Sequence, residues 1–258
     1  MDLRIASQSC RRLMMQLVCL FIAASSFGGV RPFTYVYEAT TSAPGSVESE
    51  NSVTWSTDMR NDHRFNQVDI RNEIEVGVTN RFQASLYLAN WNYIESPREN
   101  EHGWHYESAA VELIYNLIDP NSHWLGLAVY EEIKAGSEIF ELESKVILQK
   151  NIGRWIAAYN ATLEAEWEGS DWSEKSGEFS EALGISYEII PAYSVGVELL
   201  HEIDIPDWQR GNRSIVYAGP NVSYRRGRWW ITLTELFQAT GVGSETNFQT
   251  RAIVGYSF

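Results

Sequence analysis

Residues 251–258 read RAIVGYSF, and they end a stretch in which mostly apolar or aromatic side chains alternate with mostly small or polar ones. The positions between the apolar ones are small or polar except Ile253, and they include Arg251. A period of two residues predicts a β-strand with two unlike faces. Because an uncovered aromatic edge strand promotes aggregation, we expect another strand to cover this one. The mostly apolar or aromatic face carries Phe248, Thr250, Ala252, Val254, Tyr256 and Phe258.

Eleven further segments of the chain alternate in the same way, and turn residues separate them. Strands of soluble sheets usually have about 5–6 residues, whereas a tilted strand that crosses a membrane needs about 9–11. All twelve segments reach the second length, which favours membrane-spanning strands. The predicted strands occupy residues 46–57, 63–77, 81–93, 104–117, 122–134, 138–150, 154–167, 177–189, 192–203, 213–225, 228–239 and 245–258.

The connections between these segments alternate in length. Every second one is short, as in VTN, IDPN, NIG, IPA and RG, and the others tend to be longer and polar, as in residues 95–103, 168–176 and 204–212. Aromatic residues gather near both ends of the segments. These features predict an all-β, antiparallel transmembrane β-barrel of about 12 strands, with short periplasmic turns and longer extracellular loops. The aromatic residues are Phe82, Tyr115, Trp124, Trp155, Tyr193 and Trp229 near the short turns, and Trp91, Trp104, Trp167, Trp172 and Trp208 near the long loops.

The N-terminal residues predict export. Residues 1–26 combine three arginines, an apolar run too short to span a membrane and a group of small residues, which is the pattern of a cleaved signal peptide. Cys10 and Cys19 both lie in this segment, so the mature chain has no cysteine that could form a wrong disulfide during export. We expect a periplasmic N-terminal segment or partial plug at residues 27–45 and the transmembrane β-barrel at residues 46–258.

The charge of the chain excludes one class of partner. Without residues 1–26 the net charge is (20 − 3) − (34 − 1) = −16, which is unsuited to binding nucleic acid. No metal, nucleotide or hydrolase motif of the HExxH, P-loop or GxSxG kind is present, so we predict neither a metal nor a cofactor.

The sequence resembles the bacterial outer-membrane β-barrel proteins and, among them, a group of predicted outer-membrane transporters of about this length. The matching stretches are TYVYEATTSAPGSVESENSVTW, NLIDPNSHWLGLAVYEE and RAIVGYSF. Together with the signal peptide, the barrel pattern leads us to expect a monomer in the cell outer membrane, in contact with outer-membrane lipid and lipopolysaccharide. The resemblance implies that Tyr256 and Phe258 form the signal read by the outer-membrane barrel assembly machinery. It brings no catalytic residues.

The alternation predicts which charged residues line the lumen. Eleven of the fifteen candidates are acidic, which predicts a channel or transporter for the passive passage or binding of small solutes, with a lumen that mildly favours cations. The alternative is a structural network in which the bases neutralise their neighbours. The sequence does not decide which way Glu235 and the rest of strand 228–239 face. The candidates are Asp69, Arg71, Glu73, Glu75, Glu112, Glu141, Glu143, Lys145, Glu164, Glu166, Glu188, Glu198, Glu202, Arg225 and Arg251.

Two other functions compete with a channel. One is an outer-membrane lipid hydrolase, because His201 is expected opposite Glu181 on the outer face near the long loops. No serine is evident on that face, since Ser180 and Ser186 are expected to point inward, so we predict no enzyme. The other is a plugged barrel that has a structural role or binds through its loops.

Overall fold

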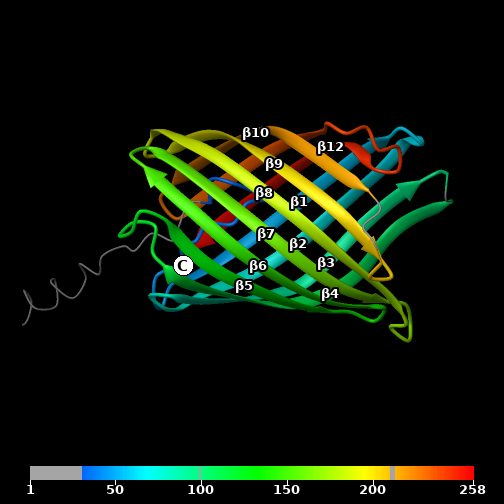
Figure 1. Cartoon of the computed structure of the whole chain (residues 1–258), viewed down its shortest axis with the longest axis horizontal. Coiled ribbons are helices and arrows are strands. Elements are labelled where there is room, and N and C mark those ends of the chain that lie inside the picture. Colours follow the sequence, from blue (N-terminus) through cyan, green and yellow to red (C-terminus); the bar gives the residue numbers. More distant parts are fainter. Residues whose placement is uncertain (1–30, 99, 210–212) are drawn as a thin grey trace, which may run out of the picture.

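The computed structural model describes residues 31–98, 100–209 and 213–258, which form one closed antiparallel β-barrel (Figure 1). The predicted signal peptide lies outside these residues. Within the described part no helix is long and apolar enough to cross a membrane. The predicted fold class and strand number are confirmed. The strands are β1 (Val47–Met59), β2 (Asp62–Thr79), β3 (Phe82–Ser96), β4 (Glu101–Ile118), β5 (Gly126–Ala135), β6 (Ile139–Ile152), β7 (Trp155–Glu168), β8 (Glu174–Ile190), β9 (Tyr193–Pro206), β10 (Ser214–Arg226), β11 (Trp229–Gln238) and β12 (Thr246–Ser257).

The last strand pairs with the first. The register of β12 on β1 runs from Glu48 opposite Ser257 to Met59 opposite Thr246. The backbone N–H of Phe258 donates to the carbonyl oxygen of Val47 at 3.0 Å. Closure satisfies the backbone groups of both strands, each of which would cost several kcal/mol if left unpaired in hydrocarbon. The aromatic C-terminal strand is therefore covered, as its sequence predicts.

The two ends of the barrel differ. We call the end where the chain turns after β2, β4, β6, β8 and β10 the turn end, and the opposite end the loop end (Figure 1). The C-terminus lies at the turn end. One strand differs clearly from its predicted bounds: β5 starts at Gly126 rather than at residue 122. Asp119 accepts hydrogen bonds from the backbone N–H of Asn121 and the hydroxyl of Ser122, each at 2.9 Å, and holds residues 119–122 in a turn.

The outer face of the barrel is apolar and carries an aromatic belt at each end. Aliphatic side chains such as Val197 and Leu233 are exposed there, as a lipid-facing surface requires. Glu235 pairs with Thr250 and also lies on this outer face. Rings on neighbouring strands are in contact: Trp155 with Tyr187, Tyr193 with Tyr224 and Trp229 with Tyr256 at the turn end, and Trp91 with Tyr106, Tyr93 with Trp104 and Phe140 with Trp167 at the loop end.

Residues 31–45 lie inside the barrel, in the half nearer the turn end (Figure 1). We call this segment the plug. It precedes β1 in the chain and contains no regular secondary structure. Phe33, Val36 and Ala39 are fully or almost fully buried. The plug therefore occupies space that the wall alone would leave open.

Candidate functional site

The inner wall carries the charged residues of the strands. Pairing register and burial place all fifteen lumen candidates on the inner face. Glu188 is exposed at the mouth of the turn end, next to an irregularity in the pairing of β8 with β9. Arg225 shares the inner face with its cross-strand partner Trp230, which is buried.

Several further charged residues of the inner wall are absent from the sequence-based prediction. In β1 the alternation of Glu48, Glu50 and buried Ser52 is as regular as in the other strands, and in β5 Tyr130 marks the same inner face. Applying the period of two to these strands would have found them. Among them are Glu48, Glu50, Glu132, Lys134, Glu178 and Asp204.

Carboxylates on successive strands lie directly opposite one another and form a continuous row. Ser85 of β3 is the only member without a charge. Because the strands are strongly tilted (Figure 1), a row perpendicular to them climbs along the barrel. It begins near the turn end and finishes near the loop end. We call this set the carboxylate row: Glu48, Glu75, Ser85, Glu112, Glu132, Glu143, Glu164, Glu178 and Asp204.

The carboxylate row has two different environments. Its lower members, those nearer the turn end, lie beside the plug, and two of them, Glu112 and Glu132, are only 1% and 3% exposed. Its upper members Glu164, Glu178 and Asp204 are partly exposed. Like charges that face each other directly across a sheet are destabilising. A barrel selected only for stability would not repeat such pairs on six strands from β4 to β9.

Bases and phenols compensate the buried part of the row. The Arg71 guanidinium lies 2.8 Å from Glu132, which also accepts a hydrogen bond from the Tyr130 hydroxyl at 2.6 Å. Glu112 accepts hydrogen bonds from Tyr87 at 2.7 Å and from Tyr37 of the plug at 3.1 Å. The plug thus takes part in the network that holds the buried acids.

The Glu198 carboxylate is the principal anchor of the plug. It accepts hydrogen bonds from three successive backbone N–H groups, those of Thr34 at 3.0 Å, Tyr35 at 2.8 Å and Val36 at 3.1 Å. On the wall side Thr234 and Asn221 also donate to it, at 2.6 and 3.0 Å. Such charge-assisted bonds are roughly twice as strong as bonds between neutral groups. Glu198 therefore fixes the turn of the plug mainly through the backbone, and the Thr34 hydroxyl adds a longer contact to the same carboxylate at 3.5 Å.

Side-chain amides of the wall hold the rest of the plug in a similar way. Asn160 accepts from the backbone N–H of Tyr37 at 2.6 Å and donates to its carbonyl oxygen at 3.0 Å. Gln149 accepts from the N–H of Ala39 at 2.7 Å, and Gln83 accepts from the N–H of Ser42 at 2.9 Å. These amides supply the partners that the backbone of the plug would otherwise find in a sheet or in water.

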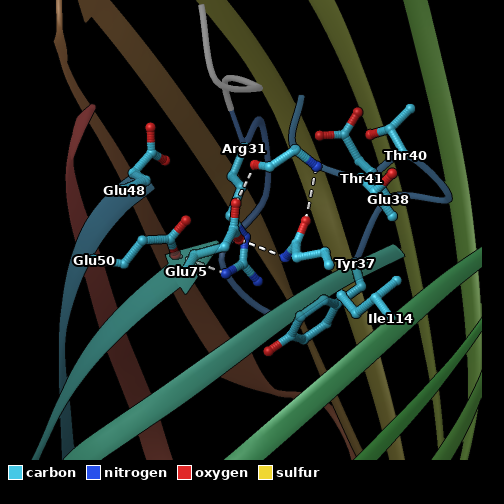
Figure 2. A pocket seen from close by; sticks show the side chains of 11 residues that line it. Arg31, Tyr37, Glu38, Thr40, Thr41, Glu48, Glu50, Glu75 and Ile114 are labelled. Atoms are coloured by element: carbon cyan, nitrogen blue, oxygen red, sulfur yellow. Dashed lines mark hydrogen bonds and ion pairs between the residues drawn. The ribbon is translucent and has the colours of Figure 1, made fainter. Parts of the chain in front are cut away.

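A small cavity separates the plug from β1–β4 (Figure 2). Its volume is about 60 Å³, enough for about two water molecules. Arg31 crosses it and pairs with Glu50 at 2.8 Å. The Arg31 guanidinium and the Lys145 ammonium both lie over the ring of Tyr37, at 4.4 and 4.3 Å from its centroid. One cation of the plug, Arg31, and one of the wall, Lys145, thus lie against the same ring.

Glu38 lies on the plug, outside the membrane-spanning strands. Burial raises the pKa of its carboxyl group to about 7, and the nearby Arg31 acts in the opposite direction. In a displaced plug this carboxyl group would be hydrated and would titrate in its ordinary range, near 4. Protonation therefore favours the inserted plug, and this contribution is lost as the pH rises through about 7.

Phe33 provides the apolar contact of the plug. Its ring packs with Ala158, Ala182, Leu200 and other inward side chains of β7–β11. A Cβ added at Gly184 would lie only 2.6 Å from Cε1 of that ring. The lack of a side chain at residue 184 therefore creates the space that the ring fills.

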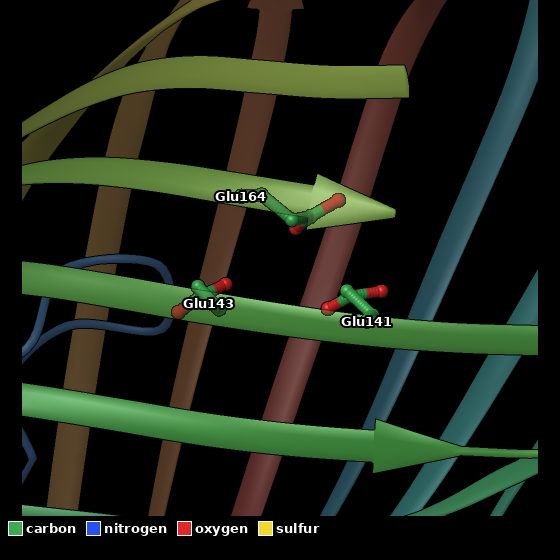
Figure 3. A group of neighbouring side chains, drawn as sticks. All are labelled: Glu141, Glu143 and Glu164. Atoms are coloured by element: carbon green, nitrogen blue, oxygen red, sulfur yellow. The ribbon is translucent and has the colours of Figure 1, made fainter. Parts of the chain in front are cut away.

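Three carboxylates of β6 and β7 form a tight cluster (Figure 3). Oxygens of Glu141, Glu143 and Glu164 all lie within 4.8 Å of one another. Lys145 pairs with Glu143 at 2.7 Å, and Lys134 pairs with Glu141. Two ammonium groups thus already supply positive charge to the cluster. It is explained as an ion-pair network and does not require a bound metal.

Fold and lumen together define the class of the protein: it is a twelve-stranded transmembrane β-barrel of the bacterial outer-membrane type. The chain belongs to the family described as a family of unknown function (DUF6662), whose profile matches residues 26–253. No curated protein matches the sequence.

Several solved structures are similar to this barrel. The NanC porin has 11% sequence identity and a TM-score of 0.54, over 82% of this chain and 98% of that one. A KdgM porin in complex with disordered oligogalacturonate has 14% identity and a TM-score of 0.51, over 83% and 98%. The translocator domain of the autotransporter NalP from Neisseria meningitidis has 11% identity and a TM-score of 0.54, over 100% and 98%. At these identities the similarity concerns the fold alone.

Proposed function

We propose that the protein is an outer-membrane channel for small cationic solutes, and that the plug closes it in the state described here. The carboxylate row is the observation that carries this proposal. Rings and rows of acidic side chains select cations by replacing part of their hydration and by repelling anions. A row that climbs from the buried half of the lumen to the partly exposed half offers such contacts along the whole route.

The orientation follows from the fold class. Outer-membrane barrels keep short turns in the periplasm and longer loops outside, so the turn end would face the periplasm. The partly exposed carboxylates Glu164, Glu178 and Asp204 would then form an outward-facing vestibule. A cation entering it would meet the plug and Lys145 as the barrier. Displacement of the plug toward the periplasm would open the route.

The test is the ion current through single barrels in a planar bilayer, with a salt gradient across it. We expect small or rare currents from the full mature chain. Deleting residues 31–42 should raise the conductance and give a reversal potential that favours cations. This deletion spares Gly45, whose N–H donates to the carbonyl oxygen of Gly77 at 2.7 Å and so fixes the start of the wall.

Two controls make the result decisive. The characteristic heat-dependent gel shift of folded barrels must be the same for both chains, and neutral sugars must permeate vesicles faster after the deletion. If the folded deletion variant conducts no better than the full chain, the wall itself closes the lumen and the channel proposal is wrong.

A further inference from the structure

The outer face of β8–β10 carries a hydrogen-bonded chain of Glu181, His201 and Ser214 near the loop end (Figure 1 shows the three strands). Nδ1 of His201 lies 3.1 Å from Oε2 of Glu181, and Nε2 lies 2.8 Å from Oγ of Ser214. Tyr159 of β7 donates its hydroxyl hydrogen to Oε1 of Glu181 at 2.5 Å. Three neighbouring strands thus contribute one carboxylate, one imidazole and one hydroxyl in line.

The chemistry of the partners sets the direction of these bonds. An ionised carboxylate only accepts, so Nδ1 of His201 carries the hydrogen in its bond to Glu181. Nε2 is then the acceptor for the Ser214 hydroxyl. In this tautomer His201 is positioned to remove the proton of Ser214, which is the arrangement of an activated serine nucleophile.

The serine is missing from the sequence-based prediction for a geometric reason. Ser214 is the first residue of β10, directly opposite Ile203 rather than His201. Its bond to His201 is diagonal, and only the register of β10 on β9 reveals it. The expectation that no serine shares this face with His201 is therefore wrong, whereas the expected pairing of His201 with Glu181 is found.

An apolar groove runs from this site along the lipid-facing wall. Its upper part has a volume of about 350 Å³ and is lined by Tyr159, Leu183, Leu199 and Val216 beside Glu181 and His201. A second part of about 410 Å³ shares Leu183 and Leu199 and continues over Ala218 and Gly219 toward the middle of the strands. Small residues of β10 leave this space between larger aliphatic neighbours.

We propose that Ser214, His201 and Glu181 hydrolyse an acyl ester of a membrane lipid whose acyl chain lies in this groove. With the loop end outward, the polar residues lie toward the outer head groups and the groove extends into the hydrocarbon. An acyl lipid has the same order of groups: a polar head, an ester and an apolar chain. A soluble ester outside the membrane would not place its groups in this order along the wall.

The reaction balances with water as its only other reactant. Oγ of Ser214 attacks the ester carbonyl carbon while Nε2 of His201 takes the hydroxyl proton. The ester C–O bond breaks, and His201 returns the proton to the leaving alkoxide. Water then attacks the carbonyl carbon of the acyl-serine while Nε2 of His201 accepts its proton. The bond between that carbon and Oγ breaks, His201 returns the proton to Oγ, and the products are a fatty acid and free Ser214. Glu181 is a positioning residue that holds the imidazole in the productive tautomer.

The first test is covalent labelling of the folded full mature chain in detergent with a fluorophosphonate, which reacts with activated serines. We expect label at Ser214, loss of label in Ser214→Ala and in His201→Ala, and unchanged label in Ser144→Ala. Ser144 is the matched control because it also faces outward and donates to a carboxylate, that of Glu131 at 2.7 Å. A folded wild-type chain without label, or label that survives in Ser214→Ala, overturns the proposal.

Fatty acid release from vesicles then identifies the lipid. One set contains phosphatidylethanolamine and phosphatidylglycerol, and a second set also contains lipopolysaccharide. Release from the first set assigns a phospholipid, and release only from the second assigns the lipopolysaccharide acyl ester. Turnover should fall about a hundredfold or more in Ser214→Ala. Glu181→Gln should lower kcat with KM almost unchanged, and absence of release from both sets contradicts the proposal.

A variant of the groove tests the place of the acyl chain. Ala218→Phe should slow the release of long acyl chains severalfold and leave a short soluble ester unaffected. Ala252→Phe, on the outer face of β12 away from the groove, is its control. Equal effects on long and short esters would contradict binding of the chain over Ala218. None of these changes touches the lumen, so single-channel currents of Ser214→Ala should equal those of the wild type.

Discussion

Among single residues, Glu198 accepts more hydrogen bonds from the backbone of the plug than any other wall side chain in the described part of the chain. It receives the N–H groups of Thr34, Tyr35 and Val36 together, and it is 1% exposed. Each hydrogen bond to a charged group contributes about 1.5–3 kcal/mol. Removing the charge while keeping the shape should therefore loosen the plug and leave the strands in place.

Glu198→Gln should raise the frequency of open-channel events about a hundredfold, which corresponds to a loss of about 3 kcal/mol from the inserted plug. The amide keeps an acceptor oxygen but turns an N–H group toward the donors of the plug. Single-channel recording measures the effect. Glu188→Gln at the exposed mouth is the matched control, and an equal effect in both variants would show that Glu198 does not hold the plug.

Gly184→Ala should also loosen the plug, because its Cβ would lie 2.6 Å from the ring of Phe33. Overpacking of this kind costs about 1–3 kcal/mol, so open events should become about 5 to 150 times more frequent. In a chain that already carries Phe33→Ala, the same substitution should have little further effect, because the clash is gone. Full additivity of the two changes would mean that the ring lies elsewhere.

At the scale of elements, the strands follow from local pattern and the plug does not. The period of two fixes strand type and facing at each position, so twelve strands and the inward facing of residues such as Glu141 and Glu164 could be predicted. Residues 31–45 have no period. Their partners Gln83, Gln149, Asn160 and Glu198 are spread over four strands far apart in sequence, and only the assembled barrel brings them together. The position of the plug inside the lumen therefore cannot be read from its own sequence and depends on the assembled barrel.

A disulfide between plug and wall should lock the channel shut. The hydroxyl oxygens of Thr34 and Thr234 lie 2.7 Å apart, so cysteines at both positions are placed to bond. The mature chain is expected to have no other cysteine, which keeps the pairing unique. We expect Thr34→Cys with Thr234→Cys to abolish open events when oxidised and to recover them on addition of a reductant.

The single variants Thr34→Cys and Thr234→Cys serve as controls and should not respond to reductant. If the oxidised double variant still opens as often as the reduced one, the plug does not need to leave the wall for conduction.

At the scale of the whole molecule, the carboxylate row should determine ion preference. Neutralising its three upper members with Glu164→Gln, Glu178→Gln and Asp204→Asn should move the reversal potential of the plug-deleted channel toward zero. The electric field of the route weakens when these charges are removed, whereas the bore hardly changes. The permeability of the same channel to neutral sugars, measured in vesicles, should stay constant.

Glu131→Gln combined with Glu235→Gln is the control for this experiment. Both side chains lie on the outer face, separated from the lumen by the wall. Unchanged selectivity in the upper-row variant, or an equal change in the outer-face variant, would count against a role of the row in conduction.

The plug is held mainly through its main chain, and this has a consequence for how the barrel can vary. A receptor that recognises N–H and carbonyl groups is indifferent to most side chains of its ligand. Substitutions at residues 36 and 39 would therefore preserve docking as long as the new side chain fits. The inner wall therefore binds the plug much as a peptide-binding groove binds a peptide. Other short sequences could replace the plug without changes to the strands of the barrel. In the proposed channel, the segment that closes the lumen and the carboxylates that select ions therefore belong to different parts of the sequence, and each can change without the other.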